Sequence, residues 1–305
     1  MQSPRIEDPE SRALLIHLGG LGDACLSESI FLSLSRHFGG KIDASGYTRY
    51  LGLFSQYFEK VHSIESARWL HLFSDYPSNV RYGQIVFVGK DRDGKLRERW
   101  QGLSKEKVVF IEMYPDGEFT ARGPLCKDFS GQAGLTGERE STAGQIHVEE
   151  YQLAQLRNYG IAAIKKEIEP KPLNRVILYP EEELRKTKWS SRNFVDLYHA
   201  LRNRGLAVDI VQSLGLELDL REKVLLDDLA EVRGYFREGG IFVSNDSGMA
   251  HFAGRCGLFT ITVFSDTDPS VWHPRGRNIS LKRGEGEIRV RSIEELILSL
   301  LLGLK

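Results

Sequence analysis

Short apolar runs alternate with helix-length segments along the first half of this chain. Runs without polar interruption predict strands that are buried on both faces, as in a parallel sheet. After the first run, apolar residues recur at every fourth position from 26 to 38, which predicts a helix, and Gly39-Gly40 suits its carboxyl end. The strands predicted in this half lie at residues 13–18, 41–44, 61–64, 85–88 and 108–111, and a further helix lies at 147–159.

The alternation restarts after a charged segment, residues 165–174, which holds two prolines and is the best linker candidate. Strands separated by helices predict parallel sheets. In this half the predicted strands lie at 176–179, 207–212, 241–244 and 260–264, and the helices at 193–204, 217–230, 248–256 and 292–302.

The fold class expected from this pattern is α/β, with two doubly wound, Rossmann-like domains. We place an N-terminal domain at residues 1–168 and a C-terminal domain at 175–290. A terminal helix at 291–305 follows, and it could pack back toward the N-terminal domain. A length of 305 residues suits two domains of about 150 residues each.

Composition narrows the class of protein. The formal net charge of −1 gives no overall field toward nucleic acid, so no nucleic-acid partner is expected. No stretch approaches the roughly 18 apolar residues of a membrane span, and residues 1–12 lack an apolar signal core. The three cysteines are widely spaced, which favours reduced thiols and a cytoplasmic location.

Two polar turns each follow a predicted strand and precede a predicted helix. The first is Gly19-Gly20-Leu21-Gly22-Asp23, and the second runs from Ser244 to His251. We call them the first and the second elbow. Both fall at carboxyl ends of strands, where open α/β sheets bind ligands.

The second elbow has the chemistry of an anion site. A phosphate could sit against the amides of Ser247, Gly248 and Met249, because the first amides of a helix lack internal partners and carry positive dipole charge. Asp246 is a good helix-capping residue, and His251 could donate a proton. The alternative is an ordinary capped helix with His251 as a core histidine.

The first elbow allows several interpretations. Gly20-Leu21-Gly22 resembles the opening of a dinucleotide fingerprint, with Asp43 as the ribose-binding acid, but Cys25 replaces the third glycine. Alternatively, Asp23 is a general base that takes a proton from an incoming hydroxyl. In the simplest case Asp23 only caps its helix.

Together, the two elbows and three further patches resemble glycosyltransferase family 9, the heptosyltransferase-like enzymes of lipopolysaccharide core assembly. The resemblance implies a GT-B fold, with two Rossmann-like domains facing across a cleft. It implies inverting, metal-independent transfer of a heptose-like sugar from a nucleotide-diphosphate sugar, for example ADP-heptose, to a lipopolysaccharide-core or related glycan. The matching patches are Leu14 to Ala24, His147 to Gly160, Lys188-Trp189 with Asn193-Phe194, Asn245 to His251, and Phe264 to Gly276.

The same resemblance assigns roles to individual residues. Asp23 matches the general base. The family resemblance implies no cofactor and no metal. We therefore interpret neither Asp91-Arg92-Asp93 nor Asp266-Thr267-Asp268 as a metal site. The expected partners are the donor and a glycolipid or oligosaccharide acceptor, with at most peripheral contact at the inner face of the inner membrane. The donor-binding candidates are Gly22, Lys188, Asp246, Ser247, Gly248, Met249 and His251.

One segment departs from the family pattern. Residues Glu181 to Glu183 would repel a diphosphate if they faced it, and either Lys186 or Lys188 could reach phosphate. A second hypothesis is therefore a catalytically weakened nucleotide-sugar-binding or assembly protein. A third, an NAD(P)-linked oxidoreductase, rests on the first elbow alone.

The acceptor leaves weaker signals. From residue 81 to 107 there are eight Lys/Arg against four Asp/Glu. We hypothesise that Arg92, Arg97 and Arg99 in this band help to hold an acidic acceptor, against the alternative of an ordinary solvated face. The irregular stretch 112–145 is the candidate acceptor loop.

Overall fold

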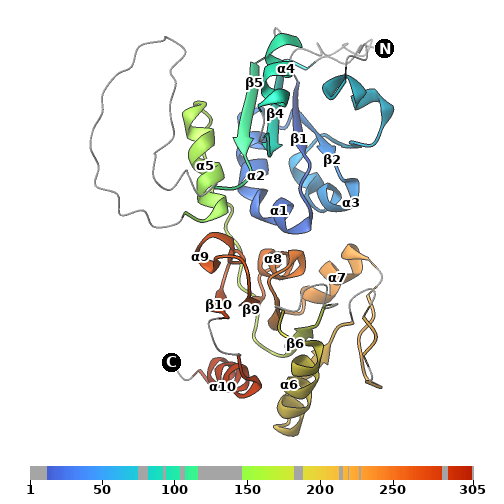
Figure 1. Ribbon diagram of the computed structural model, residues 1–305, viewed down its shortest axis with the longest axis vertical. Coiled ribbons are helices and arrows are strands. Elements are labelled where there is room, and N and C mark those ends of the chain that lie inside the picture. The colour runs from blue at the N-terminus through green and yellow to red at the C-terminus, as the bar shows by residue number, and fades with distance from the viewer. Residues whose placement is uncertain are drawn as a thin grey trace, which may run out of the picture. The chain divides into compact units, whose positions relative to one another are not determined.

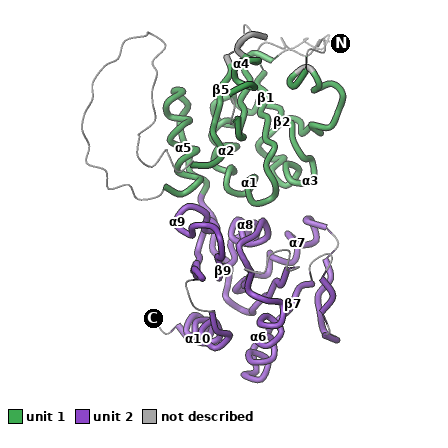
Figure 2. The backbone as a smooth tube through the Cα atoms, in the orientation of Figure 1, with its two compact units in different colours: residues 1–166 green, residues 167–305 purple. Residues whose placement is uncertain are grey.

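The structure is a computed structural model of the whole chain, shown in Figure 1. The chain divides into two compact units, residues 1–166 and residues 167–305 (Figure 2). Among the described residues, no helix is long and apolar enough to cross a membrane. The residues that the structure describes are 12–74, 82–91, 94–103, 107–115, 146–181, 188–212, 216–218, 220–226, 228–283 and 288–303.

In its described part, unit 1 forms a five-stranded parallel sheet with the order β3-β2-β1-β4-β5, which is the Rossmann order. The central strand is buried at every position, as its uninterrupted apolar run predicts. The strands are β1 (Ala13–His17), β2 (Ile42–Gly46), β3 (Lys60–Ser63), β4 (Gln84–Gly89) and β5 (Lys107–Glu112). The helices are α1 (Leu21–Leu26), α2 (Glu28–His37), α3 (Thr48–Leu51), α4 (Lys95–Leu103) and α5 (Val148–Asn158), with short 3-10 helices at Gly52–Tyr57 and Ala67–Leu72.

Two helix predictions in unit 1 were incomplete. The helix predicted up to residue 38 is broken in two at Ser27, which ends α1 and begins α2. The Ser27 hydroxyl lies 3.3 Å from Nε2 of His17, so a side-chain contact marks the break. Helix α4 was not predicted, because four of its nine residues are charged and only three are apolar.

The described part of unit 2 contains a second five-stranded parallel sheet, with the order β10-β9-β8-β6-β7. Counted within the unit, this is the doubly wound order 2-1-3-4-5. The strands are β6 (Val176–Tyr179), β7 (Val208–Ile210), β8 (Ile241–Asn245), β9 (Phe259–Phe264) and β10 (Asn278–Lys282). The helices are α6 (Ser191–Asn203), α7 (Leu229–Phe236), α8 (Gly248–Arg255), α9 (Pro269–Trp272) and α10 (Val290–Leu301).

The predicted helix at residues 217–230 was wrong. Helix α7 begins only at Leu229, and the described residues before it carry no helix. Instead, Val224 forms a parallel bridge with Val211, so this segment runs beside the continuation of β7. Strand β10 was missed because its apolar and polar residues alternate over only five positions.

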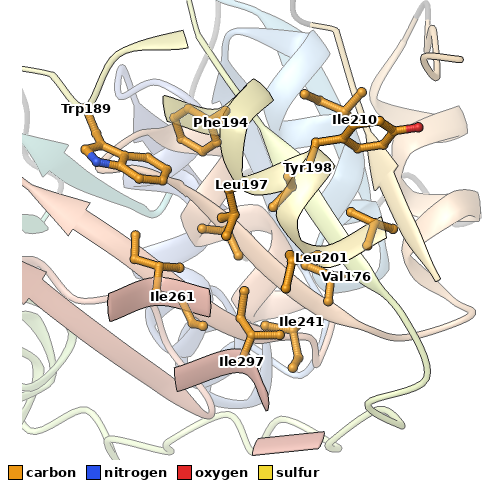
Figure 3. Close-up of a cluster of buried hydrophobic side chains, with 14 of the residues drawn as sticks. Val176, Trp189, Phe194, Leu197, Tyr198, Leu201, Ile210, Ile241, Ile261 and Ile297 are labelled. Atoms are coloured by element: carbon orange, nitrogen blue, oxygen red, sulfur yellow. The ribbon is translucent and has the colours of Figure 1, made fainter. Parts of the chain in front are cut away.

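One apolar core holds the sheet of unit 2 against α6 and α10. Figure 3 shows Leu197 and Leu201 of α6 in one cluster with Ile241 and Ile261 of the sheet and Ile297 of α10. Ile293 and Ile297 are completely buried in this core. The apolar face of the terminal helix is therefore used within unit 2.

The segment between the units is tied down on both sides of the boundary. Before it, the amides of Ile164 and Lys166 donate to the hydroxyls of Ser33 and Ser29, at 2.8 and 2.9 Å. After it, the Lys171 amide donates to the carbonyl of Gly257 at 2.8 Å. These bonds give the charged connection a defined path along each unit.

Asp43 is a structural residue of unit 1. It lies near the amino end of β2 and is buried, whereas a ribose-binding acid would lie at the carboxyl end. Its carboxylate accepts hydrogen bonds from Arg12 at 3.0 Å and from the Tyr82 hydroxyl at 3.1 Å, and it lies 3.2 Å from Nε2 of His62. This placement removes the second half of the dinucleotide fingerprint.

The substitution Asp43→Asn should lower the free energy of unfolding by about 1.5–3 kcal/mol, because it removes the buried carboxylate that Arg12, His62 and Tyr82 contact, while Arg12 keeps its pair with Glu59. Urea unfolding followed by tryptophan fluorescence measures this. The matched control is Glu222→Gln, which breaks a largely exposed pair with an arginine and should cost less than about 0.5 kcal/mol. Equal losses in the two variants would contradict a structural role for Asp43.

Candidate functional site

Each sheet has a point where the strand order reverses, and both elbows lie there. In unit 1 this point lies between β1 and β4, and in unit 2 it lies between β6 and β8. Ligands of doubly wound sheets bind outside the carboxyl ends of the strands at such points. The first elbow follows β1 and the second follows β8, so the fold places both at ligand-binding positions.

At the first elbow, both oxygens of the Asp23 carboxylate are held. Asp23 is the third residue of α1, and its Oδ2 accepts the Gly20 amide at 2.8 Å. The Tyr114 hydroxyl donates to Oδ1 at 2.5 Å. Asp23 therefore does cap its helix, and a second contact fixes the direction in which its other oxygen points. Gly22 is the second residue of the same helix.

Two residues around Asp23 escaped sequence reasoning. Tyr114 follows β5 and Lys90 follows β4, so both come from the same sheet edge as the elbow. The Lys90 ammonium lies 4.4 Å from the centre of the Tyr114 ring. Burial raises the pKa of the Tyr114 hydroxyl, and the neighbouring Asp23 carboxylate raises it further, so Tyr114 stays a proton donor at neutral pH. Both residues come within two positions of the end of a strand, and this feature of the sequence could have identified them.

The buried side chain of His17 contacts residues on both sides of Asp23, namely Gly19 and Ser27. Burial lowers the pKa of its imidazole from 6.5 to about 4, so the ring is neutral at pH 7. The Gly19 amide lies 3.3 Å from Nδ1, which makes Nδ1 an acceptor and places the ring proton on Nε2, facing Ser27. A Cβ on Gly19 would lie 2.4 Å from Cβ of Asp23, so only glycine fits between the histidine and the aspartate.

At the second elbow, Ser247 is the residue that caps α8, and its side chain forms no capping hydrogen bond. The prediction that Asp246 caps this helix was wrong. Asp246 lies one residue earlier, its amide donates to Val263 at 2.9 Å, and its carboxylate accepts the hydroxyl of Thr267. Burial raises the pKa of Asp246, whereas the Thr267 hydrogen bond and the charges of Lys188 and Lys282 lower it.

The remaining candidates of this elbow lie on the first turns of α8. Gly248 and Met249 are the first two residues of this eight-residue helix, and their amides belong to the four that have no partner within a helix. His251 is buried, with Nε2 at 3.9 Å from Oδ1 of Asp246. The imidazole thus lies next to the carboxylate.

A pair of side-chain hydrogen bonds joins the lysine–tryptophan segment to the second elbow. Asn245, the last residue of β8, accepts the Trp189 amide at 3.0 Å and donates to the Trp189 carbonyl at 3.1 Å. The Trp189 indole donates to the Ile288 carbonyl at 2.8 Å. Two segments 56 residues apart in sequence are therefore joined, and Lys188 is brought to the carboxyl end of the sheet.

Lys188 forms an ion pair with Glu181, at 3.1 Å from Nζ to Oε2. Burial raises the pKa of Glu181, Lys188 lowers it, and Asp246 raises it. Glu181 therefore lies beside two of the donor-binding candidates, Lys188 and Asp246. Glu183 and Lys186 lie outside the described residues.

The weaker candidates serve local structure where they are described. Arg97 stacks on the Phe110 ring at 4.8 Å and lies 3.8 Å from the Glu112 carboxylate. The Asp-x-Asp triplets also have local roles, since the carboxylates of Asp91 and Asp268 accept amides at the starts of α4 and α9. Arg99 lies on α4 with partial exposure. Arg92 and the acceptor-loop candidate from 116 to 145 lie outside the described residues.

The chain is similar in structure to known glycosyltransferases. Over 94% of this chain and 99% of the other, it aligns with E. coli heptosyltransferase WaaC, solved with ADP, at a TM-score of 0.61 and 13% identity. E. coli ADP-heptose lps heptosyltransferase II aligns over 96% and 99%, at 0.60 and 15% identity. A glycosyl transferase family 9 protein from Veillonella parvula aligns over 96% and 97%, at 0.61 and 10% identity.

Sequence comparison adds nothing to this likeness. No protein-family model matches the chain. No curated protein matches it either. The structural likeness covers nearly the whole chain, and the predicted GT-B class, α/β with two Rossmann-like units, is confirmed.

His17 should make the stability of unit 1 depend on pH. The unfolded chain takes up a proton on this ring near pH 6.5, whereas the folded chain does so only near pH 4. Stability from this group is therefore complete above pH 6.5 and is lost as the pH falls toward 4, by roughly 3 kcal/mol in all.

Urea unfolding at pH 7 and pH 4.5 tests this with His17→Gln. We expect the wild type to lose about 2–3 kcal/mol more than the variant between the two pH values. The exposed His37→Gln, at the end of α2, should behave as the wild type. An identical loss in wild type and His17→Gln would show that the ring titrates normally in the fold.

Proposed function

We propose that this chain is an inverting, metal-independent glycosyltransferase that uses a nucleotide-diphosphate sugar. The observation that carries the proposal is the second elbow, where the start of α8, Lys188 and His251 surround the carboxyl ends of β6 and β8 on a GT-B fold. E. coli heptosyltransferase WaaC, which has this fold, was solved with ADP. ADP-heptose is accordingly the first donor to test.

Donor binding rests on positive charge that the protein itself supplies. The first amides of α8 carry the positive end of the helix dipole, and a diphosphate can lie against them. Lys188 adds a full charge at the same sheet edge, and His251 adds a possible proton donor. As the sugar–phosphate bond breaks, these groups stabilise the charge that develops on the leaving diphosphate. No step of this scheme requires a metal ion.

Acceptor activation is assigned to Asp23. The hydroxyl of the acceptor attacks the anomeric carbon as the bond to the nucleoside diphosphate breaks, and the configuration inverts. Asp23 takes the hydroxyl proton and is left as the neutral acid. The Gly20 amide and the Tyr114 hydroxyl hold the carboxylate in one orientation, which is what a positioned base needs.

The acceptor is proposed to be a lipopolysaccharide-core or related glycan, on the resemblance to heptosyltransferases. The enzyme would then work in the cytoplasm, with at most peripheral contact to the inner membrane. Among the described members of the basic band, Lys90, Lys95 and Arg97 are exposed and Arg99 is partly exposed.

A specific observation favours a second candidate function. The Glu181 carboxylate already occupies Lys188, the group that should bind the donor phosphate. If that pair excludes the donor, the chain is a GT-B protein with weakened turnover that binds nucleotide sugars or partners instead.

The test uses Asp23→Asn with ADP-heptose as donor and a bacterial glycolipid extract as acceptor. Transfer should fall by about 10²–10⁴-fold, because the amide cannot accept the proton, while the Kd for ADP changes by less than about twofold. The matched control is Asp228→Asn, which keeps the cap of α7 and should leave both values unchanged.

Three other results would decide against parts of the proposal. Wild-type turnover in Asp23→Asn would remove Asp23 from the chemistry. Loss of transfer in the presence of EDTA would contradict metal independence. ADP binding by the wild type without transfer to any acceptor would favour the second candidate function.

A further inference from the structure

The ion pair between Lys188 and Glu181 is partly sequestered from water. The side chains are 23% and 19% exposed, and the nitrogen–oxygen distance is 3.1 Å. Screening by solvent is weaker there than at an open surface, so the glutamate is a real competitor for any other anion at this lysine.

Four charges meet at this sheet edge, and they cancel. Asp246 lies close enough to both Lys188 and Lys282 for each to lower its pKa, and Lys282 donates to the Thr267 carbonyl at 2.5 Å. Glu181 is the fourth group, and Asp246 acts on it as a like charge. Without Glu181, the cluster would carry one net positive charge.

We propose that Glu181 is a built-in competitor for the donor diphosphate: it holds Lys188 in the free protein and must be displaced when a nucleoside diphosphate binds. The inference rests on the proposed function, since it assumes that the diphosphate binds at the second elbow. It makes Glu181 a determinant of donor affinity rather than a catalytic residue.

Replacement of Glu181 by the diphosphate is physically reasonable, because both groups gain interactions when the Lys188–Glu181 pair breaks. The diphosphate replaces one anion on Lys188 by another and adds contacts with the first amides of α8. The displaced Glu181 regains hydration that it lacks in the buried pair. The loss of this hydration on burial is what raises the pKa of Glu181. Lys188 therefore contributes little net affinity while Glu181 is ionised, because an existing ion pair has to break first.

The substitution Glu181→Gln tests this directly, since it removes the charge and keeps the shape. Isothermal titration with ADP should show binding at least about tenfold tighter than in the wild type, because a like-charge repulsion is removed. The gain should be smaller for AMP, which carries one phosphate fewer. The control Glu222→Gln, in an exposed pair with Arg202, should leave the Kd unchanged.

The lysine supplies the second half of the experiment. Lys188→Met should weaken ADP binding only slightly in the wild-type background, and it should remove most of the gain in the Glu181→Gln background. Thermal melting verifies that each variant folds. If Glu181→Gln melts well below the wild type, Glu181→Ala takes its place, with the same expectation.

The outcomes separate the two claims. Equal or weaker ADP binding in Glu181→Gln, with measurable binding in the wild type, overturns the inference and leaves the proposed function standing. Binding of ADP by Glu181→Gln alone supports both. If neither protein binds ADP, UDP or GDP at millimolar concentration, the proposed function itself fails.

Discussion

The parallel pairing of β6 with β8 determines where charged side chains can lie in unit 2. Both faces of this sheet are covered, so its strands are apolar and polar groups collect where the strands end. The register pairs Tyr179 with Ser244, and two residues further along each strand come Glu181 and Asp246. In unit 1, the register of β1 with β4 pairs His17 with Val88. Gly19 and Lys90 therefore each come two residues after this pair. Strand pairing thus brings together the groups on which the proposed chemistry depends.

Much of the fold could be predicted because burial on both faces leaves a plain trace in the sequence. Strand β1 is apolar apart from His17, β4 is an apolar run from Ile85 to Val88, and the glycines that follow several helices end them. The failures occurred where tertiary contacts outweigh local pattern. Among the described residues of 217–228, Val224 forms a bridge with Val211 and none is helical, and the kink at Ser27 lies in contact with His17.

The candidate site divides in the same way. Asp23 and the residues of the second elbow follow strands directly, so their positions could be predicted from the sequence. Tyr114 could not be assigned to Asp23 in advance, because 91 residues separate them and only the sheet brings them together. The pairing of Glu181 with Lys188 was likewise open, since the sequence offered two lysines and three glutamates in one short segment.

The proposed chemistry depends on binding of the donor diphosphate at the start of α8. Hydrogen–deuterium exchange with and without saturating ADP measures this most directly, because the first amides of a helix exchange quickly until a ligand covers them. We expect new protection at residues 247–249 and around Lys188. Protection confined to the first elbow, at residues 19–23, or no protection at α8 in the presence of bound ADP, would contradict it.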